Sequence, residues 1–253
     1  MSITASELVL YGCADIPTSD GQTTGGAIDS TRRPVFSQIT ITPSASTVLK
    51  AASSSTSDGA KTVTIVGRDA TGANVTDTIT LSATAGTYVA GTVQFERVLS
   101  VNLSAAAVGT VTVTDSESTP ATVATIPPGE VGFYALFQNA SSGSAAINRY
   151  ELVYWKNTDA SLTLTSAEVT LTADPSGVTK IGLGAATGNL GTITNRTTAP
   201  AGITFVSTNT AQSLPGGSLA AGVGMGVWVN QSLAANQTAL KSTFTLQLSG
   251  NTT

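Results

Sequence analysis

The stretches of this chain that decide its fold class are Lys61–Val66, which reads KTVTIV, and Thr76–Leu81, which reads TDTITL. In both stretches apolar residues alternate with polar ones, so an extended chain would have one apolar face and one polar face. This period of two is typical of a half-buried β-strand. The segment between them, residues 67–74, is polar and contains glycine, which favours a hairpin loop.

The same alternation continues on both sides of this hairpin. It predicts further strands over residues 36–42, 93–104 and 109–114. Short strands bounded by Gly, Asn, Asp and Ser are typical of a sandwich or small barrel. We therefore predict a β-sandwich module over residues 35–116.

A second group of short strands follows a segment that carries the signals of a linker. Residues 117–130 contain Pro127-Pro128-Gly129, which stiffens the backbone and removes hydrogen-bond donors. Beyond it the pattern predicts a second β-sandwich domain over residues 131–253. Its expected strands are residues 132–138, 149–156, 161–164, 168–173, 179–183, 203–206, 224–229 and 243–248. Residues 233–241 could form a short helical turn.

The N-terminal region is expected to differ from these two units. Residues 2–12 read as a strand, and residues 14–34 are rich in Gly, Ser, Thr and Asp and end in Arg32-Arg33-Pro34. We interpret residues 1–34 as a strand followed by an extended arm. The predicted fold is therefore all-β, with two β-sandwich units of immunoglobulin-like or jelly-roll-like kind and an extended N-terminal arm.

The composition argues against catalysis. The chain has 253 residues, no histidine, a single cysteine and only 10% charged residues. Without histidine, a Ser-His-Asp triad, a Cys-His pair and imidazole metal ligands are excluded. The Gly-x-Ser-x-Gly and Gly-x-x-x-x-Gly-Lys motifs are absent as well. We expect no enzymatic activity and no catalytic, cofactor-binding or metal-binding residues.

Charge and hydropathy also limit the partners. The net charge is −4, and Arg32-Arg33 is the only adjacent basic pair, so binding of nucleic acid is not expected. The longest apolar stretch, Ala220–Val229, is too short and too rich in glycine to span a bilayer. We therefore expect no membrane partner.

Two further features have a plain structural interpretation beside a functional one. Cys13 cannot form an internal disulfide, and we favour a small half-buried side chain near the first strand over an intermolecular bond. Asp69, Asn74 and Asp77 supply oxygen ligands near a tight loop, which would suit Ca²⁺. Backbone hydrogen bonds within the loop are the favoured explanation for Asp69 and Asn74.

Aromatic residues are concentrated in the second unit. Phe133, Tyr134, Phe137, Tyr150, Tyr154, Trp155 and Trp228 lie there, in a chain with 5% aromatic residues. We expect them to form its core, and the alternative is an anchor surface for a partner, because Tyr and Trp are favoured at interface hot spots. Alternation places Tyr154 and Trp155 on opposite faces of one strand, which suits a central strand or a subunit interface. The candidate partner-binding residues are Arg32, Arg33, Tyr154, Trp155 and Trp228.

Three stretches resemble a family of tailed-bacteriophage virion proteins. They are the opening Ser6–Tyr11, the run Arg149–Asp159 with Leu162–Val169 after it, and the ending with Leu214–Gly217, Gly226–Val229 and Phe244–Leu246. The run is similar to that family's R-Y-x-x-V-Y-x-K-N strand pair. Residues 61–113 separately resemble a small β module common in phage structural proteins, and this module is an insertion relative to the family.

The resemblance implies a non-enzymatic virion component. The first hypothesis is a capsid decoration, or cement, protein on the surface of the phage head, assembled in the host cytoplasm. Its partners would be the major capsid protein and copies of itself, with a homotrimer expected by analogy. The alternatives are a tail, neck or baseplate component, and a carbohydrate-binding adhesin with an exposed aromatic platform at Trp155 or Trp228.

Overall fold

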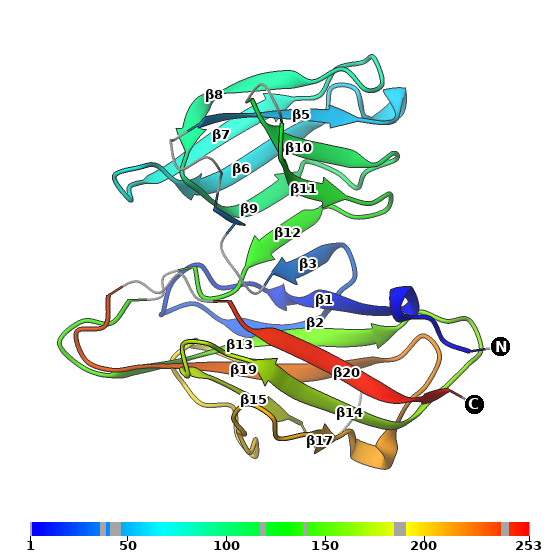
Figure 1. Cartoon of the computed structure of the whole chain (residues 1–253), viewed down its shortest axis with the longest axis vertical. Helices are drawn as coiled ribbons and strands as arrows, with labels where there is room; N and C mark the ends of the chain where they lie inside the picture. The colour runs from blue at the N-terminus through cyan, green and yellow to red at the C-terminus, as the bar shows by residue number, and fades with distance from the viewer. Residues whose placement is uncertain are drawn as a thin grey trace. The chain divides into compact units, whose positions relative to one another are not determined.

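The computed structural model describes residues 2–35, 39–40, 47–116, 120–138, 141–184, 191–238 and 243–252. In these residues the regular structure is β-strand, apart from 3₁₀ turns at Ala5–Glu7 (η1), Thr56–Asp58 (η2) and Pro215–Gly217 (η3) (Figure 1). The prediction of an all-β, sandwich-like chain is confirmed. Within the described part no helix has the length and apolar character needed to cross a membrane.

The chain divides into two compact units. Unit 1 comprises residues 1–30 and 136–253, and unit 2 comprises residues 31–135. Unit 2 is therefore an insertion between two parts of unit 1, and each unit contains its own pair of sheets.

Unit 1 is built from a six-stranded and a four-stranded sheet. The larger sheet contains, in spatial order, β15 (Thr179–Leu183), β19 (Gly224–Leu233), β13 (Ile147–Asn157), β1 (Leu8–Asp15), β2 (Thr24–Asp29) and β16 (Thr192–Ile193). In the smaller sheet the central strand is β14 (Leu164–Ala173). It pairs with β20 (Thr245–Thr252), β17 (Gln212–Ser213) and β18 (Ser218–Leu219).

Strand β13 is the centre of the larger sheet. It pairs antiparallel with β1 on one side and with β19 on the other. Leu152 and Tyr154 pack on one face with Cys13 and Trp228 in a buried cluster, and Val153 on the opposite face is also fully buried. The predicted coverage of this strand on both faces is confirmed, and β13 is a central strand.

Unit 2 is likewise built from two sheets. One contains β3 (Arg32–Val35), β12 (Gly132–Ala135), β9 (Arg97–Leu103), β6 (Thr62–Arg68) and β7 (Asn74–Thr80), with β4 (Ile39–Thr40) also paired to β9. The other contains β11 (Thr122–Ile126), β10 (Val111–Asp115), β5 (Thr47–Ser53) and β8 (Val89–Phe95). Alternate apolar residues from both sheets, among them Leu49, Val63, Ile65, Phe95 and Val113, form one buried core.

A buried carboxylate closes one end of unit 2. Asp58 in η2 is fully buried, and its Oδ1 accepts hydrogen bonds from Lys61 Nζ (2.7 Å) and from the Val108 N–H (2.8 Å). Its Oδ2 accepts from Ser53 Oγ (2.6 Å) and from the Gly109 N–H (3.0 Å). Burial alone would raise the pKa of Asp58, but these donors outweigh it and hold the pKa well below its usual range. Asp58 thereby links the end of β5 to residues that adjoin β6 and β10.

A second aspartate joins the two sheets of unit 2. Asp77 lies in β7, and its Oδ2 accepts hydrogen bonds from the N–H groups of Thr92 (2.7 Å) and Val93 (3.0 Å) in β8. The contact requires glycine at position 91, because a Cβ atom there would lie 2.1 Å from the same carboxylate oxygen. Asp77 therefore satisfies backbone donors of β8 where its pairing with β5 is irregular.

The structure corrects several details of the sequence interpretation. Residues 14–34 were expected as an extended arm, but they contain β2, paired with β1 and β16, and β3, paired with β12. Residues 117–130 were expected as a linker, but β11 lies there and pairs with β10. The boundaries of unit 2 are accordingly residues 31 and 135 rather than 35 and 116. Glycine and proline in or beside these strands are typical of loops, although Val123, Ala124 and Ile126 of β11 belong to the buried core of unit 2.

Other strands differ in extent. The single strand expected over residues 93–104 is two strands, β8 and β9, which belong to different sheets. The two expected over 161–173 are one strand, β14, in which Ser166 has a positive φ of 48°. Strand β5 was not predicted. The strand expected at 36–42 lies mostly outside the described residues. Of the helical turn expected at 233–241, residue 233 ends β19 and the described residues 234–238 contain a turn but no helix, while residues 239–241 lie outside the described part.

The Asp58 contacts predict a large effect on stability. We expect Asp58→Ala to lower the free energy of unfolding by about 3 kcal/mol, because it removes charge-assisted hydrogen bonds and leaves buried donors unsatisfied. Asp69→Ala is a matched control, since that carboxylate accepts hydrogen bonds in the exposed hairpin loop. Urea unfolding followed by circular dichroism measures both variants. Equal losses would contradict the role assigned to Asp58.

Candidate functional site

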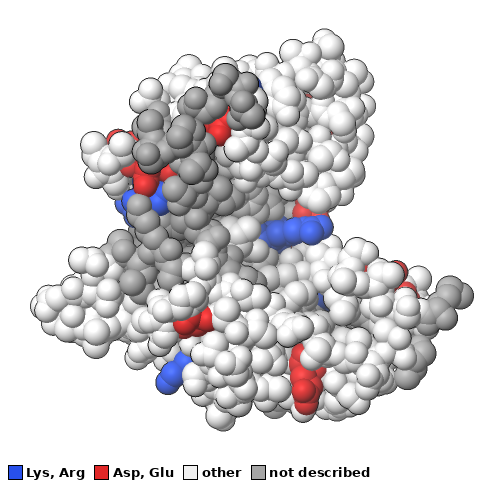
Figure 2. All heavy atoms as spheres, in the orientation of Figure 1, with Lys and Arg blue, Asp and Glu red and all other residues white. Residues whose placement is uncertain are grey.

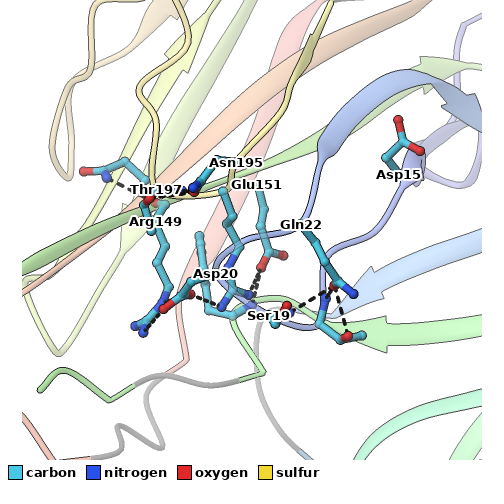
Figure 3. Close-up of polar contacts among 12 residues, drawn as sticks. Asp15, Ser19, Asp20, Gln22, Arg149, Glu151, Asn195 and Thr197 are labelled. Carbon is cyan, nitrogen blue, oxygen red and sulfur yellow. Dashed lines mark hydrogen bonds and ion pairs between the residues drawn. The ribbon is translucent and has the colours of Figure 1, made fainter.

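Four charged side chains from distant parts of the sequence meet in unit 1 (Figure 3). Asp20 lies in the loop between β1 and β2, Arg149 and Glu151 lie in β13, and Arg196 follows β16. We call Asp20, Arg149, Glu151 and Arg196 the charged cluster. It is the most concentrated group of ionisable side chains described in the chain, and it is therefore the first place to look for chemistry.

Asp20 is the hub of the charged cluster. Arg149 donates to it through Nε (2.6 Å to Oδ1) and Nη2 (2.9 Å to Oδ2), which is the paired geometry that guanidinium and carboxylate groups prefer. Arg196 donates to the same Oδ1 through Nη2 (2.6 Å) and to Glu151 Oε1 through Nη1 (3.0 Å). The side chains of Arg196 and Glu151 are 0% and 2% exposed, whereas that of Asp20 is 39% exposed.

Backbone hydrogen bonds extend the charged cluster. The Arg196 N–H donates to the Gln22 carbonyl, and the Arg196 carbonyl accepts from the Tyr150 N–H. Glu151 Oε1 also accepts from the N–H of Phe137 (3.1 Å), a residue with a positive φ of 52°. Left-handed backbone is strained for a side chain of this size, so this hydrogen bond helps to hold the turn that follows β12.

The loop that carries Asp20 is fixed locally as well. Gln22 Oε1 accepts hydrogen bonds from the N–H groups of Thr18 (2.6 Å) and Ser19 (3.1 Å) (Figure 3). The side chain of Gln22 therefore closes the loop, while the backbone carbonyl of Gln22 accepts the hydrogen bond from the Arg196 N–H. The part of the chain expected to be an arm is in this way fastened to β13.

The two carboxyl groups of the charged cluster differ in their protonation equilibria. The hydrogen bond from Arg149 is the largest of the effects that lower the pKa of Asp20 to about 2, and Arg196 adds to it. Burial raises the pKa of Glu151 to about 7, because the cost of a charged carboxylate in the interior outweighs the attraction of Arg196. The arginines hold Asp20 as a carboxylate, so it is a fixed structural acceptor.

The role that the contacts of the charged cluster support is structural: it holds segments of the chain together. Its arginines are engaged by carboxylates, and Arg196, which joins both carboxyl groups, is closed to solvent. A buried ion pair adds little net stability, because desolvation of its charges offsets much of their attraction, but removal of one partner leaves an uncompensated charge and is strongly destabilising. The charged cluster joins residues 20–22, 149–151 and 196, and it defines how these segments pack.

The predicted site residues Arg32 and Arg33 lie in β3 of unit 2. Arg33 donates from Nε to both oxygens of Glu130 (2.8 Å each) and forms an ion pair with it through Nη2. Its side chain is 42% exposed, so the guanidinium is anchored yet accessible. Arg32 is half-buried and pairs through its backbone register with Gly132.

The predicted aromatic site residues lie in unit 1. Tyr154 and Trp228 are 0% and 2% exposed and belong to the core cluster with Cys13. The Tyr154 hydroxyl donates to the Gly26 carbonyl. Neither side chain is available to a partner in this conformation. Trp155 points to the other face of β13 and is half-buried.

An apolar pocket of about 290 Å³ borders Trp228. Its lining includes Ile193, Pro200, Ile203 and Trp228. The flat face of an aromatic ring, on which a sugar would stack, is not offered there, because Trp228 is buried. The arrangement does not match the exposed aromatic platform that the adhesin hypothesis requires.

Of the three residues considered for Ca²⁺, Asp69 and Asp77 bind backbone groups, and Asn74 is an exposed residue at the start of β7. Asp69 Oδ1 accepts hydrogen bonds from the N–H groups of Thr71 (2.8 Å) and Ala73 (3.0 Å), and the Thr71 hydroxyl contributes to a lowered pKa of Asp69. Asp77 is directed to β8, as described above. Within the described residues no group of three or more His, Cys, Asp or Glu side chains is arranged to hold a metal ion.

Comparison with known proteins adds no relative: no family model, curated protein or solved structure matches this chain. Its own geometry therefore has to carry the functional argument. Sequence inspection identified Arg149 only as part of a strand and did not identify Asp20, Glu151 or Arg196. The one signal available in the sequence was Glu151 itself, a charged residue between Tyr150 and the apolar run Leu152–Trp155.

The pKa of Asp20 predicts how stability depends on pH. The folded value of about 2 lies below the ordinary value of 3.8, so the contribution of Asp20 to stability is present above about pH 4 and is lost as the pH falls toward 2. We expect Asp20→Asn to be less stable than the wild type at pH 7 and the difference to shrink between pH 4 and pH 2. Urea unfolding across this range measures it, and a difference independent of pH would contradict the contacts of Asp20.

Cys13 is expected to be chemically inert in the folded protein. Its thiol is 1% exposed and donates to the Asp15 carbonyl (3.2 Å), and burial raises its pKa to about 12. Since the thiolate is the reactive form, a thiol reagent such as DTNB should react slowly with native protein and rapidly in denaturant. Fast labelling of the native protein would show that β1 opens readily.

Proposed function

We propose that this chain is a non-enzymatic virion structural protein, and that it serves as a decoration protein that binds and stabilises a phage head. The observation that carries the proposal is the way the few charges are used. The cluster around Arg196, the Asp58–Lys61 pair and the Arg33–Glu130 pair all join segments of the fold. Charged groups are in this way engaged within the protein, and the surface is left mainly to neutral residues.

The surface is correspondingly poor in charge. Figure 2 shows blue and red atoms in small separate groups on a face that is mostly white. Neutral hydroxyl and methyl groups can be packed against another protein with little cost of desolvating ions. Such a surface suits a protein that is held between neighbouring subunits, and it does not suit electrostatic capture of a charged ligand.

The stretches that carry the resemblance to phage virion proteins occupy structural positions. Arg149 belongs to the charged cluster, and Asn157, at the end of β13, is fully buried. The Asn157 side-chain N–H₂ group donates to the carbonyls of Leu162 (2.8 Å) and Leu219 (3.1 Å). The resemblance therefore rests on residues that position β13 and the turn after it, and this supports a shared architecture for unit 1.

The test is the number of copies of this chain in purified particles. For a decoration protein we expect a ratio to the major capsid protein near one, or a simple fraction of one set by the symmetry of the shell. Quantitative mass spectrometry of particles measures the ratio. Because the surface is poor in charge, the chain should also stay bound when particles are washed at high ionic strength.

The other outcomes separate the alternatives. A few copies per particle would contradict decoration and place the chain in the tail, neck or baseplate. Absence from particles would overturn a virion role altogether. Release on washing with moderate salt would contradict an interface made of neutral groups.

A further inference from the structure

Strand β20 forms an open edge of the smaller sheet of unit 1. It pairs with β14 from Thr245, opposite Ala173, to Thr252, opposite Leu164. Within the described residues no other strand pairs with β20. The outward N–H and C=O groups of such an edge are a template for a further strand.

Most other edges in the described structure are protected. Strand β3 carries Arg32, Arg33 and Pro34, which discourage pairing. Strand β15 contains Lys180, and its residue Ile181 is already bridged to Val206. In the edge strand β8, two N–H groups are already bound by Asp77. The edge strand β7 carries that charged residue. Strand β16 is only two residues long, and β11 is five.

None of these protections is found in β20. It is eight residues long and reads TLQLSGNT, without a charge or a proline. Its exposed side chains include Thr245, Gln247, Ser249 and Asn251 on one face, whereas Leu246 is buried on the other. Leu248 shares the face of Leu246 but is half-buried, so apolar surface remains uncovered at this edge.

We propose that β20 pairs antiparallel with β20 of a second copy of this chain, about a two-fold axis perpendicular to the sheet. The leucine faces of both strands then lie on the same side, and each half-buried Leu248 gains cover from the partner strand. On the other face Thr, Gln, Ser and Asn side chains oppose one another, and such pairs form hydrogen bonds across strands. No like charges meet in any register, because the strand is neutral.

A second copy fits this edge because the strand complements itself. A two-fold contact uses the same patch on both subunits, so a patch that is neutral, hydrogen-bonding and partly apolar satisfies both sides at once. The two sheets would join into one continuous sheet with eight-residue strands at the junction. This inference deepens the proposed function and rests on it, since a shell-bound protein gains avidity when its copies are linked.

The test places like charges on the edge. We expect the wild-type chain to self-associate, and Gln247→Lys with Ser249→Lys to raise the dissociation constant by at least about tenfold through like-charge repulsion. Thr76→Lys with Thr78→Lys is the matched control, because both threonines are exposed alternate residues of another edge strand, β7. Sedimentation velocity at several concentrations measures the three proteins, and circular dichroism checks that they fold.

Charge reversal makes the test specific. The chain with Gln247→Glu and Ser249→Glu should also dissociate alone, and a mixture of the Lys and Glu variants should recover the association. In addition, Ser249→Cys should be joined to a second copy by a short bismaleimide, because Cys13 is buried and does not compete.

The outcomes separate this proposal from the proposed function. A monomeric wild type at high micromolar concentration, a Lys variant that associates normally, or a mixture that fails to recover would each overturn β20 pairing. These results use the isolated chain and do not depend on the copy number in particles. Association through β20 by a chain that is absent from particles would support the pairing and overturn the virion role.

Discussion

Arg196 carries a positive charge that water does not reach, and unit 1 has to supply carboxyl groups to hold it. Asp20 comes from the loop between β1 and β2, and Glu151 comes from the middle of the sheet. An uncompensated charge in the interior is costly, so the loop, β13 and the segment after β16 have to be in place together. This requirement couples the N-terminal residues to the rest of unit 1, although more than a hundred residues of unit 2 separate them in the sequence.

In unit 2, too, carboxylates join separate segments of the chain, but the groups that they bind are not arginines. Asp77 accepts hydrogen bonds from backbone N–H groups of β8, and Asp58 accepts from two backbone N–H groups and from the side chains of Ser53 and Lys61. Each joins segments that are distant in sequence. Backbone donors at loops and irregular pairings would otherwise be left unsatisfied. In a chain with 10% charged residues, these two carboxylates serve places where the regular pairing of strands is interrupted.

The sequence predicted the fold class because local alternation reports which face of a strand is buried. Strands β6 and β7 and their hairpin loop were recognised in this way, as was the two-sided burial of β13. Strands β2, β3 and β11 were missed because glycine or proline lies in or directly beside them, as in a loop, and because the partner of β3, β12, is distant in the sequence. Alternation also cannot distinguish one long strand from two strands of different sheets, as at β8 and β9.

The charged cluster could not be predicted from the local alternation of residues. No repeating pattern in the sequence relates Asp20 to Arg196. The contact between these two side chains exists only after β1 has paired with β13. The expectation of an aromatic core in the second unit is confirmed for Tyr150, Tyr154 and Trp228. Phe133 packs instead in the core of unit 2, and Trp155 is only half-buried. The alternative, a surface of exposed rings, could not be excluded from composition, because Tyr and Trp serve both purposes.

The insertion of unit 2 also has a consequence for synthesis of the chain. Strand β1, with its apolar run Leu8–Leu10, leaves the ribosome long before its partner β13, and translation at about 5–20 residues per second makes that interval several seconds or more. All of unit 2 is translated during this interval and can fold, since its strands pair within residues 31–135. The N-terminal strand of a nascent chain thus waits without its main partner, and a chaperone that covers apolar strands would act at this stage.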